Sequence, residues 1–459
     1  MFLGRENEVA ALQEFLNKQS GSMLIYGKRK VGKTTLINHV LANKNNKAYY
    51  ECIRGTLKDN IDGLVKVLVE ERIIPVFLDF SSFQDLFKYL NSLNGDFTIV
   101  IDEYPYLKSF EKSQTVDSIF QSIIDNYTAN IRLIVSGSHI GMMKDMLKEK
   151  NALYGRFSSV IQLKELNYYV AAQFYPEVDV YDKIGFYSVF GGSPYVNEFI
   201  NPNKSLKENI ISTILNMSSS VFLYADNLLI SDLSNSAGAE RIFALLGNGK
   251  KKYNEIEKGL KIEKNGGLSK QLNPLLNMEI IIKNFPINRP DDSKKSSYEI
   301  NDNLLRFFYA YVYRNKSALQ VIGAEAFFKE YVEPSLINFI AKRFEEQCRE
   351  YFSLMVKSGK IQGVTNIGTY YYDDSVNQKN GEFDVVLQIG RNKYDFYEVK
   401  YHKKPLSERE IDEEIRQLDE LKKTNAIKVN HIGFISVSGF ESHINDYNYI
   451  IGEDIYSIG

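Results

Sequence analysis

Two residues with catalytic potential, Glu398 and Lys400, stand two positions apart in the segment 397-YEVKYHKK-404. The stretch is rich in β-branched and aromatic residues, which predicts a strand. Because side chains alternate between the two faces of a strand, both residues point to the same face. They form either a surface ion pair of little energetic value or half of a metal-dependent nuclease site. The segment alone leaves both interpretations open.

A second candidate site lies in 22-SMLIYGKRKVGKTTLINHVL-41, where an apolar strand, the pattern G-x-x-x-x-G-K-[ST] and an apolar-periodic helix follow one another. This strand–loop–helix context indicates a phosphate-binding P-loop. Lys33 is expected to reach the β- and γ-phosphates of ATP, and Thr34 to offer its hydroxyl to Mg²⁺. The residues predicted to bind the nucleotide are Gly27, Lys30, Val31, Gly32, Lys33, Thr34, Thr35, Ser138 and Arg156.

An acidic pair follows the buried-strand pattern of 97-FTIVIDEYPYL-107. At the end of such a strand Asp102 is expected to contact Mg²⁺, and Glu103 to orient the attacking water. A helix N-cap is the alternative interpretation of the pair. A glutamate in this place favours hydrolysis over transfer of the phosphoryl group to a small substrate.

A third apolar strand begins 131-IRLIVSGSHIGMMKDML-147 and ends in polar residues. Ser138 is placed to sense the γ-phosphate, although simple turn and N-cap chemistry would equally account for Ser136 and Ser138. Arg156, in 152-ALYGRF-157, is either an arginine finger, an intersubunit contact or an ordinary surface arginine.

Length and composition limit the classes of protein to consider. The 459 residues predict two to four domains. The net charge of −2 restricts any nucleic-acid surface to a local patch, and the two cysteines, Cys52 and Cys348, are too far apart in sequence for metal-ligand spacing. The N-terminus shows no signal peptide, and no apolar run approaches 18 residues. We therefore expect a cytoplasmic protein without a membrane span.

The middle of the chain predicts two helical modules. Residues 165–232 have the pattern of a small helical lid over the nucleotide. Residues 239–285 predict three helices and a strand, and a second strand follows the polar loop 286–298, which together describe a winged helix. Lys270 and Gln271 would face outward from its recognition helix, to contact DNA or to serve a packing role.

The last part predicts a long helix over 332–356, strands over 366–373, 382–388 and 394–401, a helix over 406–423 and a strand over 432–439. This order resembles the core of PD-(D/E)XK nucleases. Asp384 and Glu398 would then hold a divalent ion, and Lys400 would position or activate the attacking water. Glu345 or Glu346 is a candidate further ligand, and Gln417 a candidate accessory residue.

The N-terminal motifs resemble archaeal-type P-loop ATPases related to STAND and AAA+ proteins. The stretches that carry the resemblance are GRENEV, YGKRKVGKTTL, TIVIDEYPYL, SGSHIGMM, LYGR and FGGSPYV, in that order within roughly the first 230 residues. The resemblance implies ATP binding and hydrolysis, with Lys33 and Thr34 at the phosphates and metal, Asp102 and Glu103 in Walker-B roles, and Ser138 as a sensor. Arg29 and Lys30 fill two positions that are often basic in the family. The family also commonly carries a C-terminal nuclease-like domain.

The sequence therefore predicts an α/β protein whose P-loop NTPase parallel sheet is followed by a helical lid, a winged helix and a restriction-endonuclease-like domain. The expected boundaries are 1–165, 166–232, 233–318 and 319–459. ATP and Mg²⁺ are the expected cofactors, DNA the expected partner, and a homo-oligomer or protein partner is an option. The main hypothesis is that the nucleotide state controls DNA binding or metal-dependent cleavage. The alternatives are a STAND-like ATP-driven signalling switch and an ATP-responsive DNA-binding regulator without nuclease activity.

Overall fold

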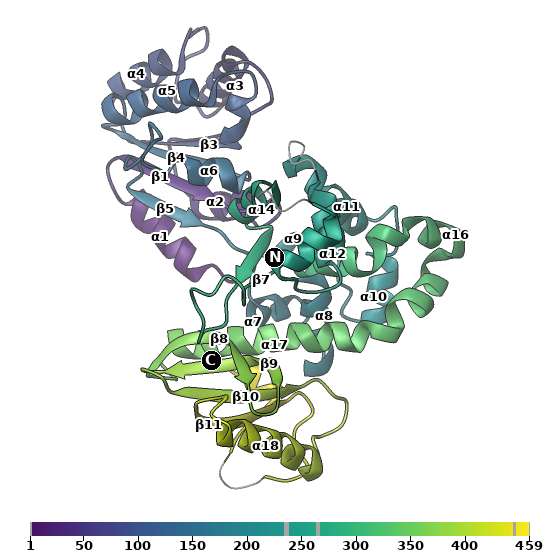
Figure 1. The fold of residues 1–459 in the computed structure, drawn as a ribbon. Helices are drawn as coiled ribbons and strands as arrows, with labels where there is room; N and C mark the ends of the chain where they lie inside the picture. Colours follow the sequence, from purple (N-terminus) through teal and green to yellow (C-terminus); the bar gives the residue numbers. More distant parts are fainter. Residues whose placement is uncertain (1, 234–237, 263–266, 444–446, 459) are drawn as a thin grey trace. The chain divides into compact units, whose positions relative to one another are not determined.

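The computed structural model describes residues 2–233, 238–262, 267–443 and 447–458. The chain forms two compact units, which meet in the sequence between Glu165 and Leu166 (Figure 1). Within the described ranges, no helix is long and apolar enough to cross a membrane.

The first unit is built on a five-stranded parallel sheet in the order β2-β3-β4-β1-β5. Its strands are β1 (Gly21–Tyr26), β2 (Lys47–Glu51), β3 (Phe97–Asp102), β4 (Ile131–Gly137) and β5 (Ser159–Gln162). Its helices are α1 (Glu6–Leu16), α2 (Lys33–Leu41), α3 (Leu57–Glu70), α4 (Phe83–Ser92), η1 (Tyr104–Lys108), α5 (Ser113–Asn126) and α6 (Ile140–Asp145). Strands β1, β3 and β4 occupy the predicted positions, whereas β2 and β5 were not predicted.

Helices cover both faces of this sheet (Figure 1). One core combines side chains of α3, α4, α5 and α6 with one face, and a second core packs α1 and α2 against the other. Since both faces are buried, the strands are nearly continuous apolar runs, as parallel sheets require. In such a sheet, ligand sites form beyond the carboxyl ends of the strands. The structure confirms the predicted α/β fold with a parallel central sheet.

The second unit begins with short helices that pack in its main core. They are α7 (Tyr168–Ala171), η2 (Ala172–Phe174), α8 (Val180–Phe190), α9 (Pro194–Asn197), α10 (Leu206–Ser212) and α11 (Ser220–Leu233). Helix α8 lies against α15 (Asn303–Phe307) and α17 (Glu333–Lys357). The segment 166–232, expected as a lid, therefore shares its apolar core with the rest of the second unit.

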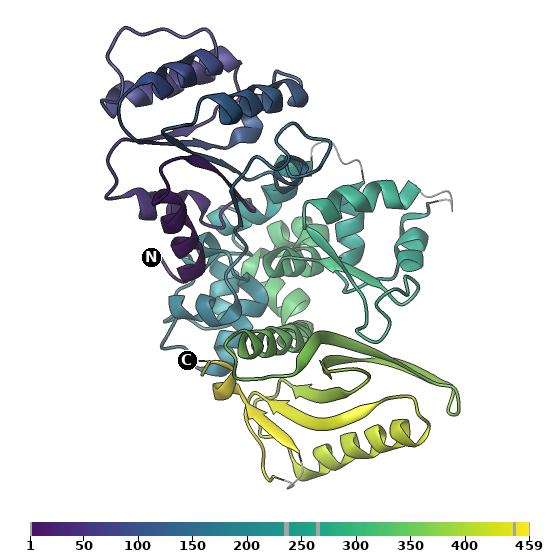
Figure 2. The same ribbon diagram turned by 90° about the vertical axis from the view of Figure 1, so that its left-hand side faces the viewer.

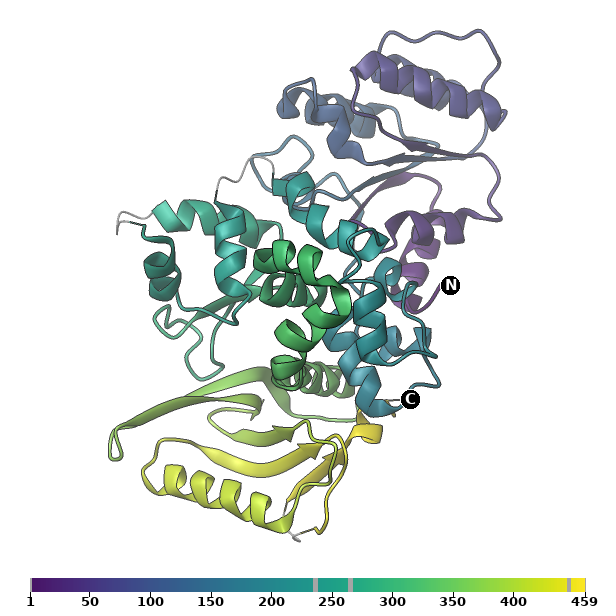
Figure 3. The ribbon, with the colours of Figure 1, turned by 90° about the vertical axis from the view of Figure 1, so that its right-hand side faces the viewer.

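Three helices and a hairpin follow, shown in teal in Figure 3. They are α12 (Ala239–Leu246), α13 (Tyr253–Leu260), α14 (Gly267–Asn277), β6 (Ile281–Asn284) and β7 (Ser297–Ile300). β6 and β7 pair antiparallel, and Lys251 bridges to Tyr298 on the far side of β7. Lys270 is exposed but Gln271 is half-buried, unlike the expectation. The start of the predicted recognition helix, residues 264–266, lies outside the described residues.

The chain then continues through η3 (Phe308–Val312), η4 (Tyr313–Asn315), α16 (Lys316–Phe327) and η5 (Phe328–Val332) into α17. The C-terminal sheet has the order β12-β11-β10-β9-β8. Its elements are β8 (Val364–Asp374), β9 (Lys379–Ile389), β10 (Tyr394–Lys400), α18 (Glu408–Lys423), β11 (Val429–Ser436), β12 (Asn448–Ile451) and α19 (Gly452–Ile455). Helix α17 packs on one face of this sheet and α18 on the other (Figure 2).

The pairing in this sheet changes direction at β10. β8, β9 and β10 form an antiparallel meander, and α18 then leads to β11, which lies parallel to β10. The order of elements is the one predicted from the sequence, with β12 and α19 as additions. The register places Asp384 in β9 and both Glu398 and Lys400 at the end of β10.

Candidate functional site

The phosphate loop of the first unit runs from the end of β1 into α2. A Cβ on Gly27 would lie 2.1 Å from the carbonyl oxygen of Leu163, so no side chain fits there. Gly32 caps α2 with φ +97°, a left-handed conformation that glycine adopts without strain. Lys30 also has a positive φ, of 63°, and Val31 is buried. The sequence thus forms a tight loop whose end is the N-terminus of a helix.

Lys33 is almost completely buried, with 5% of its surface exposed. Its Nζ donates to the carbonyl oxygens of Gly27 and Lys28, both at 3.1 Å, and to Oγ of Ser138 at 2.8 Å. These neutral acceptors hold the ammonium group inside the loop. A bound phosphate would supply the negative charge that these acceptors lack.

Asp102 meets Thr34 at the carboxyl edge of the sheet. Oγ1 of Thr34 donates to Oδ2 of Asp102 at 3.0 Å, and the backbone N–H of Glu103 donates to Oδ1 at 2.9 Å. Only 2% of the surface of Asp102 is exposed. A hydroxyl and a carboxylate are the hard oxygen donors that Mg²⁺ prefers, so the donor set fits this ion.

Glu103 and Ser138 are joined directly across the ends of β3 and β4. The backbone N–H of Ser138 donates to Oε2 of Glu103 at 3.2 Å, and the Ser138 hydroxyl donates to Oε1. Glu103 itself has φ +50°, which turns its side chain at the strand end. Lys33, Ser138 and Glu103 therefore form one connected chain of polar groups.

Other predicted residues of this unit lie in several environments. Thr35 is exposed on the first turn of α2. Arg29 donates to the hydroxyl of Tyr106 at 3.1 Å. Nε of Arg156 binds both carboxylate oxygens of Asp125, at 3.0 and 3.1 Å. In this structure the arginine is thus held by an ion pair within its own unit.

The end of β4 also contains residues with plain structural roles. The hydroxyl of Ser136 is buried without a hydrogen-bond partner among the described residues. His139 caps α6, because its Nδ1 accepts the N–H of Met142 at 3.2 Å. The turn and N-cap interpretation thus accounts for His139, while Ser138 contacts the polar chain.

Sequence reasoning missed two residues of this site. Arg5 donates to the carbonyl oxygens of Val31, at 3.1 Å, and Lys164, at 2.7 Å, and so ties the loop to the segment after β5. The only signal for Arg5 was its place in GRENEV. The hydroxyl of Tyr49, on β2, donates to Oδ2 of Asp102. No sequence signal marked Tyr49, since β2 was not predicted.

The second unit contains an acidic site beside β9. Nζ of Lys250 lies 3.1 Å from Oε2 of Glu382 and 3.3 Å from Oδ1 of Asp384. Lys250 precedes α13, so the contact joins the helical segment to the C-terminal sheet. Although burial lowers the pKa of Lys250, the charges of Asp384 and Glu382 raise it overall. The ammonium group therefore neutralises this pair of carboxylates.

The structure distinguishes Glu345 from Glu346 on α17. Burial and the neighbouring charge of Asp384 raise the pKa of Glu345, which hydrogen-bonds Asp384. Glu346 instead binds Arg306, and its Oε1 lies 3.3 Å from Nη1 of Arg343. Burial opposes these arginines, but together they lower the pKa of Glu346. Of the two candidates, Glu345 is the one that the structure brings to Asp384.

Glu398 and Lys400 do point to the same side of β10. Nζ of Lys400 lies 2.8 Å from Oε1 of Glu398 and 2.8 Å from Oε1 of Glu414 on α18. Burial raises the pKa of Glu398, and the ammonium of Lys400 partly offsets this. Burial alone would lower the pKa of Lys400, but the two carboxylates raise it. Gln417, the accessory candidate, is exposed on α18.

Glu414 was missed by sequence reasoning. It lies on α18 between the apolar positions that face the sheet, Ile411 and Leu418, and the helical period would have placed it at the edge of that face. Within the described part of the chain, no group of three or more His, Cys, Asp or Glu residues has an arrangement that could hold a metal ion. Carboxylates of Asp384 and Glu398 are suitable donors by type, but each accepts from a lysine here.

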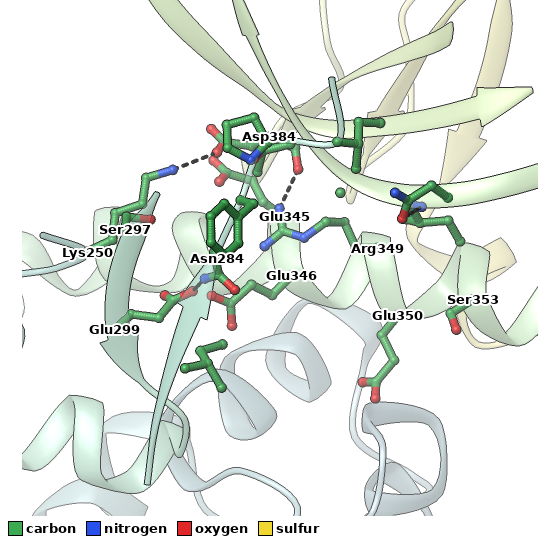
Figure 4. A pocket seen from close by; sticks show the side chains of 18 of the residues that line it. Lys250, Asn284, Ser297, Glu299, Glu345, Glu346, Arg349, Glu350, Ser353 and Asp384 are labelled. Carbon is green, nitrogen blue, oxygen red and sulfur yellow. Dashed lines mark hydrogen bonds and ion pairs between the residues drawn. The ribbon is translucent and has the colours of Figure 1, made fainter. Parts of the chain in front are cut away.

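A cavity of about 960 Å³ opens beside the acidic site. It is lined by β6, β7, α17, β8 and β9, and Figure 4 shows Glu345, Arg349 and Asp384 grouped along it. Acidic and basic side chains line it in equal number. The acids are Glu299, Glu345, Glu346, Glu350, Glu382 and Asp384, and the bases are Lys250, Arg306, Lys342, Arg343, Arg349 and Lys357.

The comparisons with known proteins agree with the geometry of the first unit. Residues 2–197 match the family described as an ATPase domain predominantly from Archaea. This part of the chain is similar to archaeal P-loop ATPase domains. Residues 308–414 match a family described as archaeal and bacterial proteins of unknown function. The predicted P-loop ATPase is thus confirmed, and the C-terminal match leaves the nuclease-like hypothesis a prediction.

Two individual proteins are similar to most of this chain. An uncharacterized protein of Methanocaldococcus jannaschii, MJECL04, is 28% identical over 425 residues, which are 91% of each chain. The Walker-type ATPase PABY2304 of Pyrococcus abyssi has a solved structure that superposes with a TM-score of 0.51 at 18% identity. That superposition covers 67% of this chain and 96% of the other, and it shows a shared fold.

Proposed function

We propose that the first unit hydrolyses ATP at the site formed by Lys33, Thr34, Asp102, Glu103 and Ser138. The observation that carries the proposal is the polar chain from Nζ of Lys33 through Oγ of Ser138 to the carboxylate of Glu103. It links the residue that binds the γ-phosphate to the one that would orient the attacking water.

Each residue has a role that follows from its contacts. Lys33 exchanges neutral acceptors for phosphate oxygens, and the loop N–H groups and the start of α2 bind the remaining oxygens. Thr34 and Asp102 would hold Mg²⁺, which neutralises the charge that develops on the phosphates. Ser138 contacts both Lys33 and Glu103, so a phosphate that draws Lys33 away also changes the hydrogen bonding of Glu103.

The test is Lys33→Ala, compared with wild type and with Lys44→Ala, which removes an exposed lysine just after α2. Binding is measured with a fluorescent ATP analogue and hydrolysis by phosphate release. We expect Lys33→Ala to lose both and Lys44→Ala to retain both. Equal hydrolysis by wild type and Lys33→Ala would refute the proposed site.

We further propose that the nucleotide state controls DNA binding or metal-dependent DNA cleavage by the second unit. The specific support is that α17, β9 and β10 bring Glu345, Asp384, Glu398 and Lys400 to one region of the sheet. The three helices and hairpin of 239–300 support a winged helix as the DNA-binding part. The proposed division of the chain remains 1–165, 166–232, 233–318 and 319–459.

The roles proposed in the second unit are limited to its own side chains. Asp384 and Glu398 would hold a divalent ion, which polarises the scissile phosphate when bound. Lys400 would position the attacking water once Glu398 and Glu414 release part of their hold on its ammonium. Lys250 must leave Asp384 for the same reason.

The experiment is cleavage of plasmid and single-stranded DNA with Mg²⁺ or Mn²⁺, with and without ATP. Lys400→Ala should abolish cleavage, while Lys404→Ala, an exposed lysine in the same segment, should not. Dependence on Lys33 would show control by ATP. No cleavage by wild type would refute the nuclease proposal; salt-sensitive DNA binding would then favour a DNA-binding regulator, and a size change with ATP a STAND-like switch.

A further inference from the structure

The carboxylate of Asp102 accepts three hydrogen bonds. Its Oδ1 accepts from the N–H of Glu103 at 2.9 Å, and its Oδ2 accepts from Thr34 at 3.0 Å and from the hydroxyl of Tyr49. An ionised carboxylate offers about four lone-pair sites, two on each oxygen. Both sites of Oδ2, the oxygen that faces Thr34, are therefore in use.

Tyr49 reaches this position because of the strand register. Residue 49 pairs with Val100 on the neighbouring strand β3, and Asp102 lies two residues further on the same face. A diagonal neighbour across two strands is within reach of an aromatic side chain. The ring packs beside the core of α1 and α2, and the hydroxyl also lies 3.4 Å from Oγ1 of Thr34.

The hydroxyl remains a donor over the ordinary pH range. A tyrosine hydroxyl has an ordinary pKa of about 10, so it is protonated at neutral pH. A protonated phenol can hold a carboxylate oxygen only by donating to it. A water molecule bound to Mg²⁺ would also donate to the carboxylate of Asp102, so it would compete with the Tyr49 hydroxyl for Oδ2.

We propose that Tyr49 is a positioning residue that sets the Mg²⁺ requirement of the ATP site by occupying Oδ2 of Asp102 until the hydrated ion displaces its hydroxyl. The inference rests on the proposed ATP site. In the metal-free state, Tyr49 keeps Asp102 and Thr34 together. When the ion binds, the phenol would turn away from the carboxylate or donate to Oγ1 of Thr34 instead.

Tyr49→Phe removes the competing hydroxyl and keeps the ring. The Mg²⁺ dependence of equilibrium binding is measured with a non-hydrolysable fluorescent ATP analogue. We expect the half-saturating Mg²⁺ concentration to fall roughly tenfold, because a hydrogen bond to a charged acceptor no longer has to be broken. Binding of the analogue in EDTA should stay at the wild-type level.

Tyr50→Phe is the matched control. Tyr50 is the next residue on β2, points to the opposite face and donates to Asn60 at 3.0 Å. Its removal also deletes a buried hydrogen bond, but the Mg²⁺ midpoint should not move. Thermal unfolding of both variants checks that the fold is retained.

The outcomes separate the two proposals. An unchanged or higher Mg²⁺ midpoint in Tyr49→Phe, with tight Mg²⁺-dependent binding by wild type, would overturn the role of Tyr49 alone. Failure of wild type to bind the analogue at any Mg²⁺ concentration would overturn the ATP site and the inference together.

Discussion

The proposed ATP site of the first unit and the acidic site of the second use the same residue types in opposite ways. In the first, Lys33 is bound by carbonyl and hydroxyl oxygens, and Asp102 by hydroxyls and a backbone N–H. In the second, Asp384 is paired with Lys250, and Glu398 with Lys400. The hydrogen bonds named here thus join the charges of the first site to neutral groups, whereas those of the second site join carboxylates to ammonium groups.

This difference has a consequence for ligand binding. A charged ligand that enters the first site meets lysine and carboxylate groups whose hydrogen-bond partners named above orient them without neutralising their charge. A cation that enters the second site must first displace an ammonium group. We therefore expect the first site to bind ATP and Mg²⁺ directly, and the second to depend on a change that moves its lysines.

The largest expected effect comes from Glu103→Gln. The amide keeps the size of the side chain and still accepts from Ser138, but it cannot act as a base toward water. Hydrolysis should fall roughly a hundredfold or more. ATP binding should stay within about twofold of wild type, because Glu103 acts on the attacking water rather than on the bound nucleotide. Phosphate release and analogue binding measure the two quantities separately.

Glu111→Gln serves as the control, since Glu111 is exposed in the loop before α5. It should leave hydrolysis unchanged. If Glu103→Gln hydrolyses ATP at the wild-type rate, Glu103 only holds Ser138 in place at the ends of the strands. The difference between the two sites would then have no effect on catalysis.

Arg306→Ala tests how much buried ion pairs stabilise the second unit. Arg306 is buried, and its guanidinium binds both Glu299, at 3.2 Å, and Glu346. Its removal leaves two buried carboxylates that have lost their main ion-pair partner and keep only the weaker influence of Arg343 and Arg349 among the described residues, so we expect a loss of about 3–5 kcal/mol in the stability of the second unit. Hydrogen exchange of α17 peptides, measured in increasing urea, localises the effect.

Arg314→Ala, which removes an exposed arginine, should change that stability by less than about 0.5 kcal/mol. Adding Glu346→Gln to Arg306→Ala should recover part of the loss, because one of the unpaired charges disappears. A loss below about 1 kcal/mol for Arg306→Ala would show that the buried charges are not held by these pairs.

Local sequence patterns predicted most of the elements that position the proposed ATP site. The Gly27–Thr34 motif is contiguous, and Asp102 and Ser138 follow apolar strands that are recognisable by themselves. The parallel arrangement then brings these strand ends together. Tyr49 and Arg5 could not be found this way, because their contacts depend on strand order and on a loop packing that no local pattern encodes.

The acidic site was less predictable for the same physical reason. The order of its helices and strands followed from periodicity, and so did the shared face of Glu398 and Lys400. The partners Lys250 and Glu414 lie 134 positions before Asp384 and 14 after Lys400, on elements whose packing decides the contact. Nor could the sequence choose between Glu345 and Glu346, which differ only in the helix face they occupy.

The buried carboxyl group of Glu350 should make the stability of the second unit depend on pH. Burial raises its pKa to about 7, while the N–H of Tyr168, at 3.3 Å, and the hydroxyl of Tyr187, at 3.4 Å, donate to it. The unfolded value is about 4.3. Because the folded pKa is the higher one, its stabilising contribution is complete below about pH 4.3 and is lost as the pH rises to about 7.

Glu350→Gln removes this titration and keeps an acceptor for both donors. The stability difference between Glu350→Gln and wild type is measured at about pH 4.5 and at pH 8. It should shift in favour of the variant by about 1–2 kcal/mol at the higher pH. Thermal unfolding at the two pH values measures this difference. Glu333→Gln, at the exposed start of α17, should show no such pH dependence; an equal shift in both variants would contradict the assignment to Glu350.

Lys250→Ala has the smallest expected effect on stability and bears most directly on the comparison. Side-chain exposure is 43% for Lys250 and 37% for Asp384, so their ion pair is worth less than about 1 kcal/mol. The same substitution removes the cation that neutralises Glu382 and Asp384. Without nucleotide, Mn²⁺ should therefore bind the Lys250→Ala protein more tightly than wild type, whereas Lys252→Ala, an exposed neighbour, should match wild type. If Mn²⁺ binding does not change, the ammonium of Lys250 does not compete with cations for this site, and the proposed difference between the two sites is wrong.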